Sequence, residues 1–205
     1  MSGVSFFVVK MSDQERINGL GRTLKFQVAL LGSVVALFWL VEAVDWLVWS
    51  YSLNQWGIRP RQLDGLWGIG LAPFLHAGFG HVAANTLPFL VLGWFVLLQG
   101  IRPFLFVTAT IMLVSGLGTW LIAPPHTVHV GASGVIFGYF GFLLLRGYFA
   151  RKASALFVSL VVILLYGGLI WGILPQGPGI SWQGHLFGFV GGGLAAYGLR
   201  SEVAK

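Results

Sequence analysis

The chain has no cysteine, and this absence removes several classes of function at once. Without a thiol there is no disulfide framework, no thiolate nucleophile and no all-cysteine metal site. Charged residues are also scarce, because Asp, Glu, Lys and Arg together make up only 9% of the 205 residues. So few polar groups cannot cover a water-soluble globule when 57% of the residues are hydrophobic. The solvent for most of the chain is therefore lipid.

Acidic residues are fewer still, with 6 Asp and Glu against 12 Lys and Arg, which gives a net charge of +6. Such a balance is typical of nucleic-acid binding only when the basic residues gather on one soluble face. Here they lie between hydrophobic runs. We therefore expect no nucleic-acid partner.

Six apolar runs are long enough to cross a membrane, since about 20 helical residues span roughly 30 Å of hydrocarbon. Gly, Pro and charged residues separate them. We predict an all-α polytopic membrane protein, a bundle of six transmembrane helices over 27–200 with tails at 1–26 and 201–205. The predicted spans are 28–49, 82–98, 103–122, 133–149, 155–174 and 182–199.

The positions of the basic residues predict which way the bundle faces. With the N-terminus inside, ten of the 12 Lys and Arg residues are cytoplasmic, and only Arg59 and Arg61 fall outside. Both termini are then cytoplasmic, and the connection at 50–81 is an outer loop that tryptophans anchor at the membrane surface. Because no Arg- and Ser-rich transit segment is recognisable, we expect a multi-pass protein of the bacterial cytoplasmic membrane.

Strongly polar side chains inside the predicted spans are few, and such residues are costly unless they face the bundle interior, which makes them functional candidates. At about 1.5 Å per residue from the cytoplasmic end of each span, Ser133, His185 and Asn85 lie at one level, roughly 20 to 22 Å above the inner boundary. Three spans therefore bring polar groups to one depth. Chance alignment is the alternative, because helices that enter from outside often begin with polar residues.

Ser133 opens the fourth predicted span within Gly131-Ala132-Ser133-Gly134. A serine at a helix start lies beside backbone N–H groups that can stabilise a developing oxyanion. The motif alone is weak, and an N-cap serine in a tight turn is the structural alternative. Residue 135 is Val and no strand pattern precedes it, which excludes the nucleophile elbow of α/β-hydrolases.

His185 precedes Gly188 in a stripe of small residues that lets a neighbouring helix approach closely. If that neighbour is the span that begins at Ser133, His185 can act as general base for the serine. His81 and Asn85 lie four residues apart on one helix face, where both can donate to an oxyanion. The alternatives are plain packing of the glycines and a tie between the second span and the outer loop.

The remaining polar residues are assigned to structure. Glu42 and Asp45 are the membrane-level acids that could orient a base, and we interpret both as interior polar packing or interfacial residues. His126 and His129 have no evident third ligand and are interpreted as loop residues. We therefore expect no metal and no cofactor. The Gly- and Pro-rich segment at 175–181 is the expected mobile cap.

In order and spacing, these residues resemble the rhomboid protease family. The likeness covers roughly 50–200. It rests on the following residues in chain order: His76, His81, Asn85, Gly131, Ala132, Ser133, Gly134, Gly184, His185, Gly188 and Gly192.

The resemblance implies a catalytic dyad of Ser133 and His185, without an acid, in a water-filled cavity open to the outside. It implies an oxyanion site formed by His81, Asn85 and the backbone N–H of Ser133. His76 would have a structural role.

Two positions depart from the family pattern. Phe137 stands where a Tyr often packs on the catalytic histidine, so the ring remains and the hydroxyl does not. The Trp-Arg signature of the first loop is absent in that form, because Gly57 and Ile58 separate Trp56 from Arg59.

By this resemblance the chain is an intramembrane serine endopeptidase. It would cleave single-span membrane proteins near the outer membrane face, where their helices unwind at small residues. The alternative is a catalytically silent rhomboid-like scaffold or chaperone that binds membrane helices, which retention of Ser133 and His185 argues against. A transporter is disfavoured because the spans show no inverted repeat. The expected partners are these substrates and the lipid bilayer, and the sequence indicates no oligomeric state.

Overall fold

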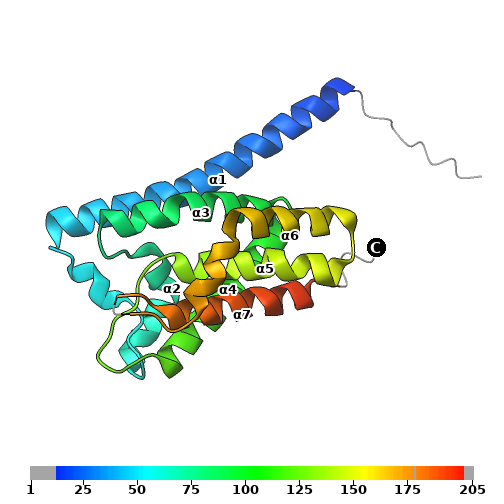
Figure 1. Cartoon of the computed structure of the whole chain (residues 1–205). Coiled ribbons are helices and arrows are strands. Elements are labelled where there is room, and N and C mark those ends of the chain that lie inside the picture. The colour runs from blue at the N-terminus through cyan, green and yellow to red at the C-terminus, as the bar shows by residue number, and fades with distance from the viewer. Residues whose placement is uncertain (1–12, 178, 201–205) are drawn as a thin grey trace, which may run out of the picture.

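The computed structural model of the chain describes residues 13–177 and 179–200. In that part, seven α-helices are joined by loops and short 3-10 helices (Figure 1). The α-helices are α1 (Asp13–Val48), α2 (Gly68–Leu71), α3 (Phe79–Leu97), α4 (Ile101–Ile122), α5 (Ser133–Ala150), α6 (Ala153–Tyr166) and α7 (Trp182–Gly198). The 3-10 helices are η1 (Ser52–Trp56), η2 (Leu63–Trp67), η3 (Ala72–Phe74) and η4 (Gly167–Ile173).

The predicted all-α polytopic membrane fold is confirmed. Within the described residues, five helical stretches are long and apolar enough to cross a membrane. They lie in α1, α3, α4 and α5 and in α6 continued by η4. The sixth predicted span is α7, whose 17 residues are near the short end of what crosses a bilayer.

Two helices differ from the predicted boundaries. Helix α1 begins at Asp13 rather than at 28, so part of the predicted tail at 1–26 is helical. Its 36 residues extend over about 54 Å, well beyond the hydrocarbon thickness. Figure 1 shows its N-terminal half diverging from the bundle. The predicted span at 155–174 is an α-helix only to Tyr166 and then tightens into η4. Residues 1–12 and 201–205 of the predicted tails lie outside the described residues.

Helix α5 forms the centre of the bundle, and most of its first three turns are buried. Helix α7 packs closely on it through the predicted stripe of small residues. A Cβ atom at Gly188 would overlap the carbonyl oxygen of Gly134, and one at Gly192 would overlap that of Gly138. Only glycine permits this backbone approach. The stripe therefore holds the start of α7 against the start of α5.

The surface of the bundle is apolar where lipid would surround it. On α6, for example, the side chains of Leu164 and Phe157 are exposed. Polar side chains lie inside instead. Glu42 and Asp45 are each only 1% exposed, and a carboxylate oxygen of Asp45 accepts a hydrogen bond from the N–H of Leu53 at 3.0 Å.

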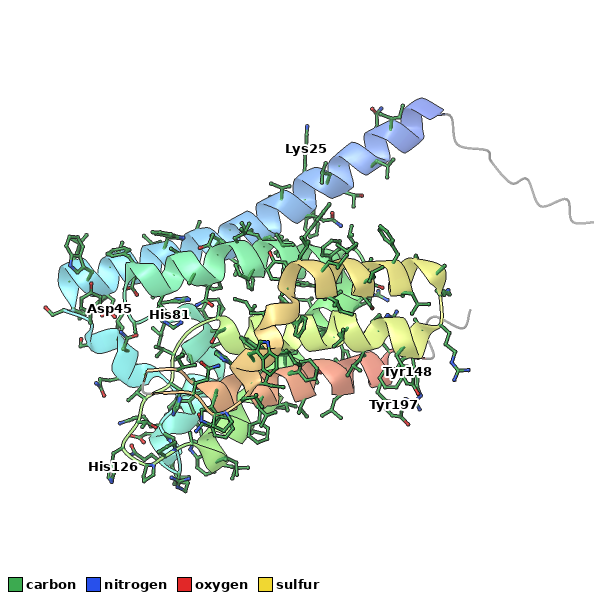
Figure 2. The ribbon with its side chains drawn as sticks, in the orientation of Figure 1. Lys25, Asp45, His81, His126, Tyr148 and Tyr197 are labelled. Atoms are coloured by element: carbon green, nitrogen blue, oxygen red, sulfur yellow. The ribbon has the colours of Figure 1, made fainter. Side chains whose placement is uncertain are left out.

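The connection at 50–81 covers one end of the bundle. Its backbone is tied to the end of α4, because Arg61 N–H donates to the carbonyl of Trp120 at 3.1 Å and the Trp120 indole N–H donates to the carbonyl of Gln62 at 2.8 Å. Figure 2 shows Asp45, His81 and His126 toward this end, and Tyr148 and Tyr197 at the opposite end. The helix starts that carry the candidate site residues therefore share one end with the long loop.

Candidate active site

Ser133 and His185 meet between the first turns of α5 and α7. The hydroxyl oxygen of Ser133 lies 2.9 Å from Nε2 of His185. The glycine contacts hold the starts of the two helices close together. A serine and an imidazole at this distance are arranged for proton transfer from the hydroxyl to the ring.

The second ring nitrogen of His185 points at a backbone group. Its Nδ1 lies 3.0 Å from the carbonyl oxygen of Gly172 in η4. A carbonyl oxygen only accepts, so Nδ1 carries the hydrogen and donates it. In the neutral ring Nε2 is then the acceptor, and the Ser133 hydroxyl donates to it. The carbonyl of Gly172 thus orients the imidazole in the way that an acid orients the histidine of a triad.

Phe137 fixes the plane of the same ring. It lies one helical turn after Ser133, and its ring stacks on His185 with centroids 4.0 Å apart and an interplanar angle of 3°. The stacking needs no hydroxyl. Phe137 therefore does for the imidazole what the sequence analysis expected of an aromatic ring at this position.

Two hydrogen-bond donors lie beside the start of α5. The backbone N–H of Ala77 donates to Nδ1 of His81 at 3.3 Å, which leaves the proton of the neutral ring on Nε2. Asn85 is 5% exposed, and its amide nitrogen has no hydrogen-bond partner. Ser133 is the first residue of α5, so its N–H has no acceptor within the helix. Three donors are thus free to bind an oxyanion.

Gly131 brings these donors together. Its φ of +114° is one that side-chain-bearing residues rarely adopt, and a Cβ atom there would lie 2.7 Å from Nε2 of His81 and 3.7 Å from the amide nitrogen of Asn85. Gly134, the other glycine of the motif, faces Ser115, whose hydroxyl donates to the carbonyl of Gly184 at 2.8 Å. Both glycines are therefore required by close contacts around Ser133.

His76 lies behind the site. It is 1% exposed, and its Nε2 accepts the N–H of Ala132 at 3.4 Å. Its ring packs between Phe38 and His81, with centroids 5.3 and 5.1 Å away. Burial, with a smaller effect of His81, lowers the pKa of His76 to about 4, so the ring is neutral at neutral pH. These contacts support the backbone just before Ser133.

An open cavity of about 920 Å³ leads to these residues. Its walls come from α3, α5 and α7, from Pro124 and residues 127–130, and from residues 176–177 and 179–181. Ser133, His185, His81, Asn85 and Phe137 all line it. Five described residues of the expected cap at 175–181 thus border the cavity. Within the described residues, no three His, Asp or Glu side chains cluster as a metal site would require.

Comparison with known proteins places the chain in a family. The model of the Rhomboid domain matches residues 63–202, which is more than half of the chain. The chain belongs to the rhomboid family. This rhomboid is an integral, multi-pass membrane protein, as its helices and family together require.

Three relatives illustrate its place among rhomboids. The uncharacterized protein Rv1337 of Mycobacterium tuberculosis is 48% identical over 179 residues, which cover 83% of this chain and 74% of that protein. The putative rhomboid protease YdcA of Bacillus subtilis is 33% identical, with 86% and 94% of the two chains covered. The rhomboid protease GluP of the same organism is 28% identical, with 80% of this chain and 33% of that protein covered.

Two contacts at the site were not predicted from the sequence. The first is the carbonyl of Gly172, which bonds Nδ1 of His185 in the place where an acid such as Glu42 could have stood. The sequence signal for this contact was the group of glycines at 167, 168 and 172. Glycines weaken an α-helix, and these lie near the end of an apolar run, where the helix changes to η4. His129, interpreted as a loop residue, bonds to Ser181 just before α7.

Proposed function

We propose that this rhomboid is an intramembrane serine endopeptidase that cleaves membrane proteins with a Ser133–His185 dyad. The observation that carries the proposal is the 2.9 Å contact between the Ser133 hydroxyl and Nε2 of His185 inside an open cavity. The names of two relatives, a putative rhomboid protease and a rhomboid protease, support the same reaction class.

In the proposed first step, the Ser133 oxygen attacks the carbonyl carbon of the scissile bond while Nε2 of His185 takes the hydroxyl proton. The ring becomes an imidazolium, whose Nδ1–H stays bonded to the carbonyl of Gly172. His185 then returns the proton to the leaving amine, and an acyl-enzyme remains on Ser133. A water molecule, deprotonated by the same nitrogen, releases the acid and restores the serine.

The negative charge that develops on the carbonyl oxygen would lie at the donors beside Gly131. Nε2–H of His81, the Asn85 amide and the Ser133 N–H are suited to this, since one such donor is worth roughly 10²- to 10³-fold in kcat. The unpartnered amide of Asn85 supports the assignment, because a buried donor without an acceptor is costly unless a ligand supplies one.

The proposed substrates are single-span membrane proteins, cut near the outer membrane face where small residues let a helix unwind. Hydrolysis needs water and an extended strand, and an open cavity of about 920 Å³ at the loop-covered end has room for both. The basic residues favour an orientation with both termini cytoplasmic in a bacterial cytoplasmic membrane, which puts this end outside. No nucleic acid enters the proposal.

The test uses the full chain in lipid bilayers with two readouts. The first is cleavage of a single-span reporter that has a Gly- and Ala-rich outer end. The second is covalent labelling by a fluorophosphonate, which reports an activated serine without requiring the right substrate. Wild type is compared with Ser133→Ala, His185→Ala and, as a matched control, Ser154→Ala, whose residue is exposed on α6.

We expect wild type and Ser154→Ala to cleave and to be labelled equally, and the other two variants to do neither. Cleavage by Ser133→Ala would contradict the mechanism. If wild type is neither labelled nor active, the dyad is silent, and the protein is better described as a scaffold that binds membrane helices.

A further inference from the structure

His129 connects three segments at the mouth of the cavity. Its backbone forms a reciprocal pair with Ile58 of the long loop, with each N–H donating to the other's carbonyl at 3.0 Å. Gly57 makes this pairing possible, because a Cβ atom there would lie 2.7 Å from the carbonyl oxygen of His129. The backbone of His129 is therefore held on the outer loop while its ring reaches elsewhere.

Both nitrogens of the His129 ring are occupied. Nε2 lies 2.8 Å from the hydroxyl of Thr127, and Nδ1 lies 2.7 Å from the hydroxyl of Ser181. The Thr127 hydroxyl donates to the carbonyl of Pro124 at 2.6 Å, so it accepts from Nε2–H. In the neutral ring, Nδ1 then accepts from the Ser181 hydroxyl. Burial lowers the pKa of His129 and favours this neutral form.

The contact between His129 and Ser181 parallels the one between Ser133 and His185. His129 lies four residues before Ser133, and Ser181 lies four residues before His185. Ser181 is the residue that precedes α7, and its carbonyl accepts the N–H of His185 at 3.2 Å. Its hydroxyl caps no helix N–H. The side chain is therefore free to bind His129, and the two contacts fix the same pair of segments at two levels.

We propose that His129 is a positioning residue that clamps the segment leading to Ser133 onto the start of α7 and so sets the Ser133–His185 contact. The expected effect of the clamp on reaction rate rests on the proposed protease function, whereas its effect on the position of His185 does not. Without the clamp, the glycine contacts still hold α5 and α7 together, but the first turn of α7 loses its tie to the loop. A displacement near 1 Å at such a site costs on the order of 100-fold in rate.

The test compares wild type with His129→Asn, Ser181→Ala and the double variant. The matched control is His126→Asn, three residues earlier in the same segment. That residue is exposed, and asparagine tolerates its φ of +63°. An asparagine at 129 is too short to bridge both hydroxyls. The readouts are kcat and KM for the reporter, the fluorophosphonate labelling rate, the thermal midpoint, and the ring ¹⁵N chemical shifts of histidine-labelled protein in bilayers.

We expect His129→Asn and Ser181→Ala each to lower kcat and the labelling rate at least about tenfold with little change in KM. The double variant should be no worse than the poorer single variant, because each single variant already removes the contact between His129 and Ser181. His126→Asn should match wild type, and all thermal midpoints should stay close. Additive losses, or equal activity of His129→Asn and His126→Asn, would overturn the clamp.

The ¹⁵N shifts separate this proposal from the proposed function. If wild type neither cleaves nor is labelled, the protease assignment fails, but the clamp still predicts that the His185 shifts change in His129→Asn and not in His126→Asn. Unchanged His185 shifts in His129→Asn would overturn the clamp whether or not the protein is a protease.

Discussion

The Nδ1 atom of His185 lies 3.0 Å from the carbonyl oxygen of Gly172, so a backbone group rather than an acid orients the candidate base. This carbonyl lies at the C-terminal end of η4, where the last carbonyls of a helix have no N–H partner within it. The orientation of His185 therefore depends on the position of η4 against α5 and α7. A shift of η4 would be felt directly at the dyad.

Gly172→Ala tests this dependence. A Cβ atom there would lie 2.5 Å from the ring of Phe137, so η4 or the stacked ring must move. We expect kcat and the fluorophosphonate labelling rate to fall about 10- to 100-fold, because the base loses its orientation. Gly168→Ala is the matched control in the same 3-10 helix, since a Cβ atom there meets nothing within 4 Å. Equal rates in the two variants would disprove the role of η4.

Gly131→Ala is expected to abolish the reaction by displacing the oxyanion donors. The new Cβ atom would lie 2.6 Å from Cε1 of His81, and φ is +114°. Gly100→Ala separates strain from displacement. It has a similar φ of +106°, lies away from the site, and its nearest new contact is an ordinary 3.7 Å. Both variants should lose about 1–3 kcal/mol of stability, but only Gly131→Ala should lose cleavage. Cleavage by folded Gly131→Ala would refute the assignment.

Asn85→Asp replaces a buried donor with an acceptor of the same shape. We expect kcat to fall roughly 10²- to 10³-fold with KM nearly unchanged, because the amide is proposed to bind only the charge that develops in the transition state. Steady-state kinetics on the single-span reporter measure the two constants. A large rise in KM with kcat preserved would instead make Asn85 a substrate-binding residue.

The sequence predicted the parts of this molecule that side-chain pattern controls. Apolar runs indicated the spans, and Ser133, His185 and Asn85 were expected at one depth because helical rise is regular. The contact of His185 with the carbonyl of Gly172 was not predicted, because every residue has a backbone carbonyl and no residue type marks the one that will accept the bond. The start of α1 at Asp13 was not predicted, because the helix begins before its apolar run does. The residues that precede the run include Arg16 and Arg22, whose charges are not typical of a membrane span. The clamp at His129 joins residues 52 apart and follows only from the fold.

Stability should fall in mild acid because His76 is buried as a neutral ring. Its pKa is about 4 in the folded protein, against 6.5 for an ordinary histidine. The stabilisation is thus complete above pH 6.5 and is lost as the pH falls from 6.5 toward 4, by up to about 3 kcal/mol. Burial also lowers the pKa of His129, which acts in the same direction. Unfolding free energies in detergent across this range measure the loss.

His76→Gln keeps an acceptor for the Ala132 N–H but does not titrate, so its stability should change less over the same range. A pH dependence equal to that of wild type would show that His76 is not the group responsible.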